Sequence, residues 1–288
     1  MKIPRYWSRA TADDMNRDGK KISISCWRSS DASQGEAHEF ALAAASRAVT
    51  NLLRGTPCNR YTYGQLPLRE EVLNSINDAQ GEPFLAVTRN NYGAVILNTA
   101  RVAFLDLDYP ENHVGGQLKQ LFARWFGSRV PCPDAQRESE IWQRLERFVA
   151  VKPDHGFRVY RTFAGLRAIA THDLFDPTSP ATLEMLEHLG TDPLYVRLCK
   201  VQDCFRARLT PKPWRCGCIP NPVRWPREDE KQQSQFEKWD ADYTAAQAKF
   251  ATCRLLGTLG LDSVRPEVAQ VIQLHDRMTR CHEPLSLA

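Results

Sequence analysis

The order of apolar and polar residues predicts a chain that mixes short strands with helices. Alternation between turn residues predicts a strand, whereas apolar residues spaced by three or four predict a helix. The predicted strands are 22–27, 84–87, 94–97, 102–108, 157–162, 166–171 and 205–210. The predicted helices are 34–53, 69–77, 115–126, 135–149, 180–189, 228–256 and 266–281. Residues 194–201 fit a strand or the end of a helix, and residues 1–21 are predicted to be largely irregular.

The order of these elements predicts an α+β protein. Residues 84–108 are expected to form a three-strand meander with a turn at 90–93. From residue 102 the order is strand, helices, hairpin, helix, strand, which is the β-α-β-β-α-β order of a ferredoxin-like or RRM-type palm with an antiparallel sheet. We therefore expect an N-terminal α/β module over 1–100, a palm over 101–215 and a C-terminal helical cap over 216–288.

The strand predicted over 102–108 carries two aspartates at alternate positions. Side chains alternate along a strand, so Phe104, Asp106 and Asp108 share one face. Pro110 cannot donate to a strand ladder and is expected to end the strand just after the acids. Two neighbouring carboxylates repel each other unless a cation lies between them, which favours a site for a divalent metal such as Mg²⁺. The simpler alternative is an acid pair that only ends the strand and binds water.

Basic residues follow the acid pair at strand spacing. Arg206 and Arg208 alternate with apolar residues, and Arg161 and Arg167 flank the predicted hairpin turn. The same region also contains Arg158, Arg197, Lys200, Lys212 and Arg215. A guanidinium binds phosphate through a planar fork of donors, so this set beside two acids suits a metal-bound polyphosphate. A solvated sheet face explains any single arginine equally simply, and it is the combination that favours a phosphate site.

Composition excludes several classes of protein. Of the 288 residues, 42% are hydrophobic and 25% are charged, which is typical of globular proteins and not of disordered chains. The net charge of +4 is too small to indicate nucleic-acid binding by itself. No apolar run is long enough for a membrane span, and the nine cysteines follow no signal peptide. We therefore expect reduced thiols, a cytoplasmic location and no membrane partner.

The acid strand and the hairpin resemble two motifs of the archaeo-eukaryotic primase superfamily, whose catalytic core is an RRM-like palm. The first motif of that family is an apolar strand ending in Asp-x-Asp, as in Phe-Leu-Asp106-Leu-Asp108. The second is a turn, Ser/Thr-x-x-Gly-x-His, that leads into a strand. Here Thr162-Phe-Ala-Gly165-Leu-Arg167 has the turn, with arginine where the family has histidine. The resemblance spans roughly residues 84–215.

This resemblance implies metal-dependent nucleotidyl transfer. Asp106 and Asp108 would hold Mg²⁺ or Mn²⁺, which bridges a nucleoside triphosphate and activates a terminal hydroxyl. The family's third motif is an acid on a later strand, for which Asp203 is the nearest candidate. Arg167 would act with the acids in catalysis, and the expected partners are a nucleoside triphosphate and single-stranded DNA or RNA. The residues expected to contact the nucleotide or its template are Arg161, Thr162, Gly165, Arg206, Arg208, Arg89, Asn90 and Tyr92.

Three other interpretations fit parts of the same pattern. The acid pair also resembles the nucleophile and general acid of a haloacid-dehalogenase-type phosphatase, a family with a doubly wound parallel sheet. An RRM-like sheet that binds single-stranded nucleic acid without catalysis would use Tyr160 and Phe163 for stacking. Zinc is a weaker cofactor candidate, and its potential ligands are Cys204, Cys216, Cys218, Cys253 and His275.

Overall fold

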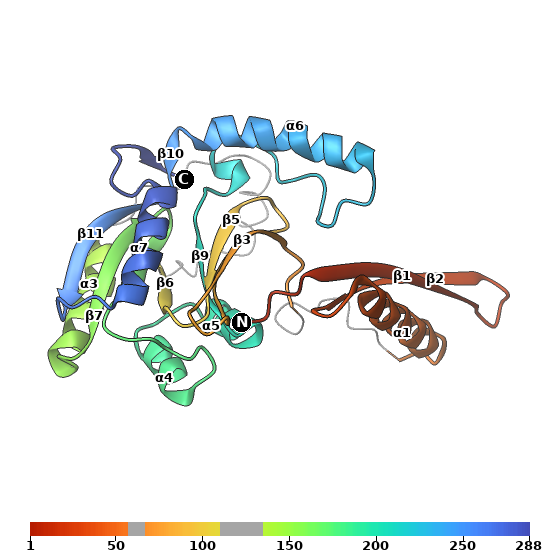
Figure 1. The fold of residues 1–288 in the computed structure, drawn as a ribbon, viewed down its shortest axis with the longest axis horizontal. Coiled ribbons are helices and arrows are strands. Elements are labelled where there is room, and N and C mark those ends of the chain that lie inside the picture. Colours follow the sequence, from red (N-terminus) through yellow and green to blue (C-terminus); the bar gives the residue numbers. More distant parts are fainter. Residues whose placement is uncertain (57–66, 110–134) are drawn as a thin grey trace. The chain divides into compact units, whose positions relative to one another are not determined.

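The computed structural model describes residues 1–56, 67–109 and 135–288 (Figure 1). Their internal contacts form two compact units, which we call the N-terminal unit (Lys2–Arg69) and the main unit (Glu70–Ala288 with Met1). The described residues contain six α-helices and several small, mostly antiparallel sheets, so the predicted α+β class is confirmed. The helix predicted over 115–126 lies outside the described residues. Across the described ranges, no helix is long and apolar enough to cross a membrane.

The N-terminal unit is a β-hairpin with one helix packed against it. Strands β1 (Tyr6–Met15) and β2 (Lys21–Ser30) pair along their whole length, and α1 (Gln34–Leu53) follows. The buried side of α1 consists of small residues: Ala37, Ala41, Ala44, Ala45 and Val49. Small side chains let the helix backbone approach the strands closely. The prediction that residues 1–21 are irregular was wrong, because β1 exposes mostly polar residues and forms through its pairing with β2.

The acid pair lies on a four-stranded antiparallel sheet of the main unit, which we call the acid sheet. Its order is β11-β7-β8-β6. The strands are β6 (Phe104–Asp108), β7 (Gly156–Thr162), β8 (Gly165–Ala170) and β11 (Cys253–Gly260). Helix α3 (Ala135–Val151) packs on one face, where Arg161 of β7 binds Glu138. Helix α7 (Pro266–Thr279) covers the other face, where Arg158 and Tyr160 bind Asp276 (Figure 1).

A second antiparallel sheet carries the arginine strand, and we call it the β9 sheet. Its order is β3-β4-β5-β9. The strands are β3 (Glu71–Asn77), β4 (Pro83–Arg89), β5 (Val95–Thr99) and β9 (Phe205–Arg208). Two predictions were wrong here. Within the helix predicted over 69–77, residues Glu71–Asn77 form a strand because they pair with β4, and β5 continues the sheet to β9 instead of to the acid strand.

The remaining elements surround the two sheets. They are α4 (Pro180–His188), α5 (Pro193–Gln202), α6 (Glu230–Gln247), the two-residue strands β10 (Phe250–Ala251) and β12 (Ser286–Leu287), and a 3₁₀ helix at Pro213–Arg215. Residues 194–201 are therefore helical. The long helix predicted over 228–256 ends at Gln247, and the chain then enters β10 and β11. Buried apolar residues of both sheets form one continuous core.

The palm-like order is present for three strands. In the acid sheet, β8 lies between β7 and β6, so β6, α3 and β7 form a split β-α-β unit. The fourth strand of the predicted β-α-β-β-α-β order, β9, pairs with β5 instead of β6, and β11 occupies the edge beyond β7. The acid strand and the arginine strand thus belong to two different sheets of one core.

A buried ion pair organises the polar side of the β9 sheet. Arg206 donates to both carboxylate oxygens of Glu70, at 2.7 and 2.9 Å, and Thr88 donates to the same carboxylate at 2.6 Å. Both charged side chains are buried. Burial is tolerable only while each charge keeps its partner, so Arg206 is committed to this sheet.

We predict that Glu70→Ala lowers the free energy of unfolding by about 3 kcal/mol, because it leaves the Arg206 guanidinium buried and unpaired. Urea unfolding followed by circular dichroism measures the loss. The double variant Glu70→Leu, Arg206→Met should recover most of it, since it removes both charges and fills the space. A loss below about 0.5 kcal/mol for Glu70→Ala would contradict this assignment.

Candidate functional site

The two aspartates lie at the end of β6, on one face of the acid sheet. Leu105 and Leu107 are buried on the other face, whereas Asp106 is half-buried and Asp108 is exposed. The strand and its alternation agree with the sequence prediction. Cross-strand pairing places Asp106 opposite Arg167 and Asp108 opposite Gly165.

The hairpin turn between β7 and β8 packs directly against the acid pair. A Cβ at Gly165 would lie 2.3 Å from the carbonyl oxygen of Leu107 and 2.8 Å from the Cα of Asp108, so only glycine fits at this position. The Thr162 hydroxyl donates to the Gly165 carbonyl at 3.1 Å and closes the turn. Thr162 and Gly165 therefore shape the backbone beside Asp108.

A third carboxylate, Asp192, lies next to the pair. Its backbone N–H donates to the carbonyl oxygen of Asp106 at 2.9 Å, and its side chain caps α5 by accepting from the backbone N–H groups of Leu194 and Tyr195. Sequence reasoning missed Asp192, because Asp before Pro193 indicates only a helix N-cap. Asp203, the third acid expected from the sequence, instead binds the N-terminal amino group at 3.1 Å.

The carboxylates repel one another strongly. The pKa of Asp108 is raised to about 6, first by its partial removal from water and then by the negative charges of Asp106 and Asp192. Lys212 and Arg208 act in the opposite direction, and each has a smaller effect than either neighbouring acid. Such a site gains free energy when it binds a cation.

Three cations face the acids. Arg208 ends β9, Lys212 precedes the 3₁₀ helix that follows, and Arg215 is the last residue of that helix. Burial and the charges of Arg208 and Arg215 lower the pKa of Lys212 to about 8, while Asp108 and Asp106 oppose this shift. Burial and Arg208 likewise lower the pKa of Arg215 to about 10. The three cations therefore disfavour one another's charged forms, as the acids do on the opposite side.

The acid pair and the three cations do not pair directly. Within the ranges that the structure describes, no hydrogen bond or ion pair joins Asp106 or Asp108 to Arg208, Lys212 or Arg215. The groups nevertheless influence each other's pKa values, so they lie within electrostatic reach. A ligand that carries a metal ion at one end and phosphates at the other would satisfy both groups.

Aromatic rings flank the cations. Arg215 stacks on Phe163 of the hairpin turn, with 4.0 Å from its guanidinium carbon to the ring centre. Lys212 lies over the ring of Trp214 at 5.6 Å, and Tyr92 meets Trp214 edge-on at 5.2 Å. Of the three residues predicted in the 89–92 turn, Tyr92 thus borders the site.

Several other predicted site residues serve the fold. Arg89 donates to Asp240 of α6 at 2.7 Å, and the Asn90 side chain accepts from the backbone of its own turn. Arg161 is on the α3 face of the acid sheet, opposite to the acids, and binds Glu138. Arg206 is held by Glu70. The prediction that Arg206 and Arg161 share the site with Arg208 fails, because both guanidinium groups are already paired elsewhere.

Arg167 connects the two sheets. Although it lies opposite Asp106 in register, its buried guanidinium donates to the carbonyl oxygen of Arg208 at 2.9 Å and to Nε2 of His275 at 3.1 Å. His275 in turn donates from Nδ1 to Asp276, which leaves Nε2 free to accept. Burial lowers the pKa of His275 to about 4, consistent with this neutral form. Arg167 therefore positions the strand that carries Arg208, and its guanidinium is committed to these two contacts.

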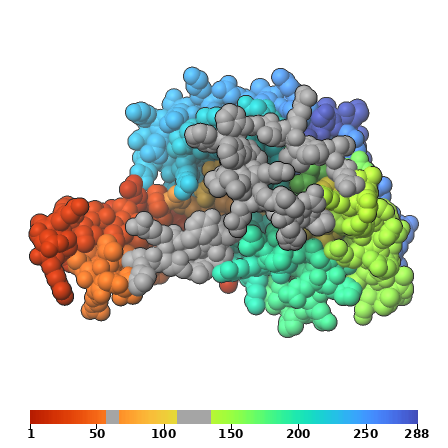
Figure 2. Space-filling model, turned by 180° about the vertical axis from the view of Figure 1, so that it is seen from behind, coloured from red at the N-terminus to blue at the C-terminus, as the bar shows by residue number. Residues whose placement is uncertain are grey.

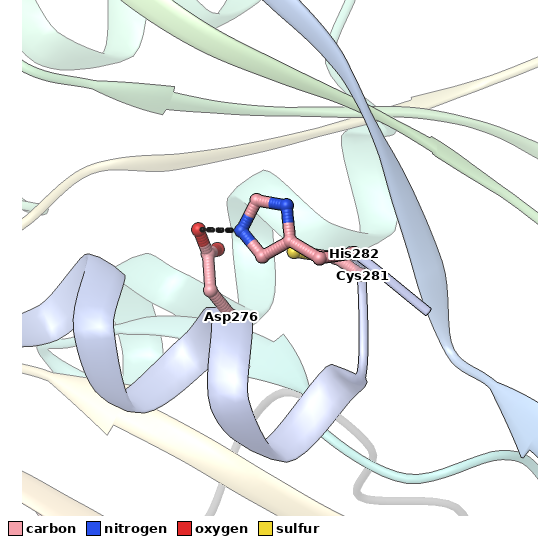
Figure 3. A group of neighbouring side chains, drawn as sticks. All are labelled: Asp276, Cys281 and His282. Carbon is pink, nitrogen blue, oxygen red and sulfur yellow. Dashed lines mark ion pairs between the residues drawn. The ribbon is translucent and has the colours of Figure 1, made fainter. Parts of the chain in front are cut away.

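A group at the C-terminal end of α7 has metal-ligating side chains, but its carboxylate already accepts hydrogen bonds. Asp276, Cys281 and His282 place ligand atoms within 4.8 Å of one another (Figure 3). Arg158 and Tyr160 donate to the Asp276 carboxylate, however, and burial raises the pKa of the Cys281 thiol to about 12. The Asp276 carboxylate is therefore already committed to a hydrogen-bonded network with Arg158 and Tyr160.

The cysteines predicted as zinc ligands do not form one cluster. Cys253 lies 4.0 Å from His275, Cys204 is buried close to Arg206, and Cys216 is next to Cys218 near α6. In the described ranges, the group at the C-terminal end of α7 is the one set of three potential ligands that is close enough for a metal, and it contains none of these residues. The described ranges therefore give no support for zinc bound by the predicted cysteines and His275.

Arg197 and Lys200, two further basic residues of the predicted set, line a cavity whose lining does not include the acid pair. This cavity of about 580 Å³ lies between α4 and α5, which are both at the surface (Figure 2, teal). Most of its lining is apolar, from residues such as Leu183, Pro193 and Val196. The cavity lacks an acid pair opposed by cations, so it does not resemble the site described above.

Comparison of the chain with protein-family models, with curated proteins and with solved structures gives no match. The function must therefore be argued from the residues and their geometry.

We predict that Asp108→Asn stabilises the protein at pH 7.5 by about 1 kcal/mol. This is less than the shift in pKa alone would give, because Asp108 is exposed. The raised pKa means that the folded protein holds this proton more tightly than the unfolded chain. Wild type therefore loses stability as the pH rises from about 4 to about 6, and the loss is complete above that range.

Urea unfolding at pH 7.5 and pH 4 measures this effect. The advantage of Asp108→Asn should shrink toward zero at pH 4, and the matched variant Asp262→Asn, at another exposed aspartate, should show no such trend. A variant that is no more stable than wild type at pH 7.5 would refute the repulsion between the acids.

Proposed function

We propose that this protein is a metal-dependent nucleotidyltransferase that binds a nucleoside triphosphate between the acid pair and the three cations and uses a nucleic-acid strand as acceptor. The observation that carries the proposal is the unpaired opposition of Asp106 and Asp108 to Arg208, Lys212 and Arg215. Carboxylate oxygens are the ligands that Mg²⁺ and Mn²⁺ prefer, and guanidinium and ammonium groups suit phosphate.

Each group has a distinct part in such a reaction. Asp106 and Asp108 would hold the metal, with Asp192 close enough to add negative charge. A bound divalent metal would neutralise the phosphates and lower the pKa of an attacking hydroxyl. Arg208, Lys212 and Arg215 would bind the phosphate oxygens and stabilise the negative charge of the leaving pyrophosphate. The hairpin turn at Gly165 keeps Asp108 in place.

The resemblance to archaeo-eukaryotic primases supports this proposal at the acid strand and the turn. The chain differs from that family at one position, where Arg167 replaces the histidine. Arg167 donates to the Arg208 carbonyl and to His275. In this proposal Arg167 positions Arg208, so the phosphate contacts come from Arg208 at the end of β9 and from Lys212 and Arg215 after it.

The antiparallel order of the acid sheet disfavours a haloacid-dehalogenase-type phosphatase, whose sheet is parallel. Binding of a single strand without catalysis is the stronger rival. Tyr160, one of its expected stacking residues, is fully buried and donates to Asp276 at 2.6 Å. The acid pair also repels phosphates unless a metal is present, so metal dependence separates the two functions.

We predict that a nucleoside triphosphate binds wild type only with Mn²⁺ or Mg²⁺, and that Asp106→Ala, Asp108→Ala weakens this binding at least about 100-fold, because the metal loses its ligands. Calorimetric titration with ATP at fixed Mn²⁺ measures the dissociation constant. The matched control is Asp242→Ala, Asp262→Ala, which removes the same charge from exposed positions and should bind as wild type does.

Equal affinity of the acid-pair variant and its control would overturn the proposed function. Metal-independent binding of an oligonucleotide, without binding of ATP, would instead favour the non-catalytic rival. If ATP binds as predicted, extension of a labelled primer by wild type and its loss in the acid-pair variant would establish the transfer step.

A further inference from the structure

Trp214 has an unusual position for so large an apolar side chain. It lies in the 3₁₀ helix Pro213–Arg215, between the two cations Lys212 and Arg215, and 43% of its surface is exposed. By contrast, Trp7 and Trp239 are buried. Because it lies beside two cations, this exposed indole offers an apolar face on which a flat ligand can stack.

Neighbouring residues hold the ring in place. Tyr92 meets it at 5.2 Å with an interplanar angle of 61°, and the carbonyl of Tyr92 accepts from the backbone N–H of Asn221 at 3.0 Å. The turn that carries Tyr92 is itself closed by Asn90. A side chain anchored in this way loses little further conformational freedom when a ligand stacks on it.

We infer that Trp214 is the platform on which the base of the metal-bound nucleotide stacks, with Tyr92 as its support. This inference rests on the proposed function, because it assumes that the phosphates lie between the acids and the cations. It assigns the ligand's base as well as its phosphates, and so distinguishes a nucleotide from any other polyphosphate.

The position of Lys212 connects the ring to the acids. Its ammonium lies 5.6 Å from the centre of the Trp214 ring and is also within the electrostatic influence of Asp106 and Asp108. The ammonium of Lys212 thus lies beside the indole and feels the charge of the acid pair. A nucleoside triphosphate likewise carries metal-binding phosphates at one end and a base at the other.

The test compares ATP with inorganic tripolyphosphate, which carries the phosphates but no base, by calorimetry at fixed Mn²⁺. Wild type should bind ATP more tightly than tripolyphosphate. Trp214→Ala should weaken ATP binding on the order of ten-fold and leave tripolyphosphate binding unchanged, because base stacking contributes about that much. Trp214→Phe should keep most of the affinity for ATP, which separates stacking from a loss of folding.

A matched control is Val151→Ala, which shortens another exposed apolar side chain, at the end of α3, and should change neither affinity. Equal ATP binding by wild type and Trp214→Ala would overturn the stacking inference but leave the proposed function standing. If wild type binds neither ligand, the proposed function fails and the inference with it.

A third arm asks whether the stacked base belongs to the strand. Binding of a single-stranded oligonucleotide is measured for the same variants. If Trp214→Ala loses oligonucleotide binding while its ATP affinity equals that of wild type, the ring serves the strand and the assignment to the nucleotide is wrong. Loss of ATP binding with tripolyphosphate binding intact supports the assignment.

Discussion

The candidate site of the main unit depends on two like charges held at the end of one short strand, β6. Leu105 and Leu107 anchor β6 in the core, and the hairpin backbone at Gly165 packs closely against the end of the strand. Partial removal from water and then the charges of Asp106 and Asp192 raise the pKa of Asp108 to about 6. A cation bound between such carboxylates would relieve their repulsion.

The opposing cations come from a different sheet, so the site depends on how two sheets are joined. Arg167 of β8 donates to the backbone of Arg208 on β9, and the neutral His275 accepts from the same guanidinium. The Asp276 network beneath α7 in turn fixes His275. Arg167, His275 and Asp276 thus support the fold, while the charged groups of Asp108 and Lys212, which form no ion pair in the described ranges, lie at the candidate site.

The sequence allowed the local part of this arrangement to be predicted. Alternation along 104–108 placed Asp106 and Asp108 on one face, and the turn before Gly165 identified the hairpin beside them. It did not reveal that β9 pairs with β5, because the partner of a strand depends on contacts distant in the chain. For the same reason Arg206 and Arg208, alike by spacing, have different roles: Glu70 neutralises one and leaves the other free to face the acids. Asp192 was missed because its capping role hides its proximity to Asp106.

The most direct test of a metal-bound nucleotide at this site is a crystal structure of the protein with Mn²⁺ and a non-hydrolysable nucleoside triphosphate, with the ion located by its anomalous scattering. The account predicts an anomalous peak between the carboxylates of Asp106 and Asp108, with phosphate density reaching Lys212 and Arg208. A peak at Asp276, Cys281 and His282 instead, or a nucleotide bound away from β6, would contradict it.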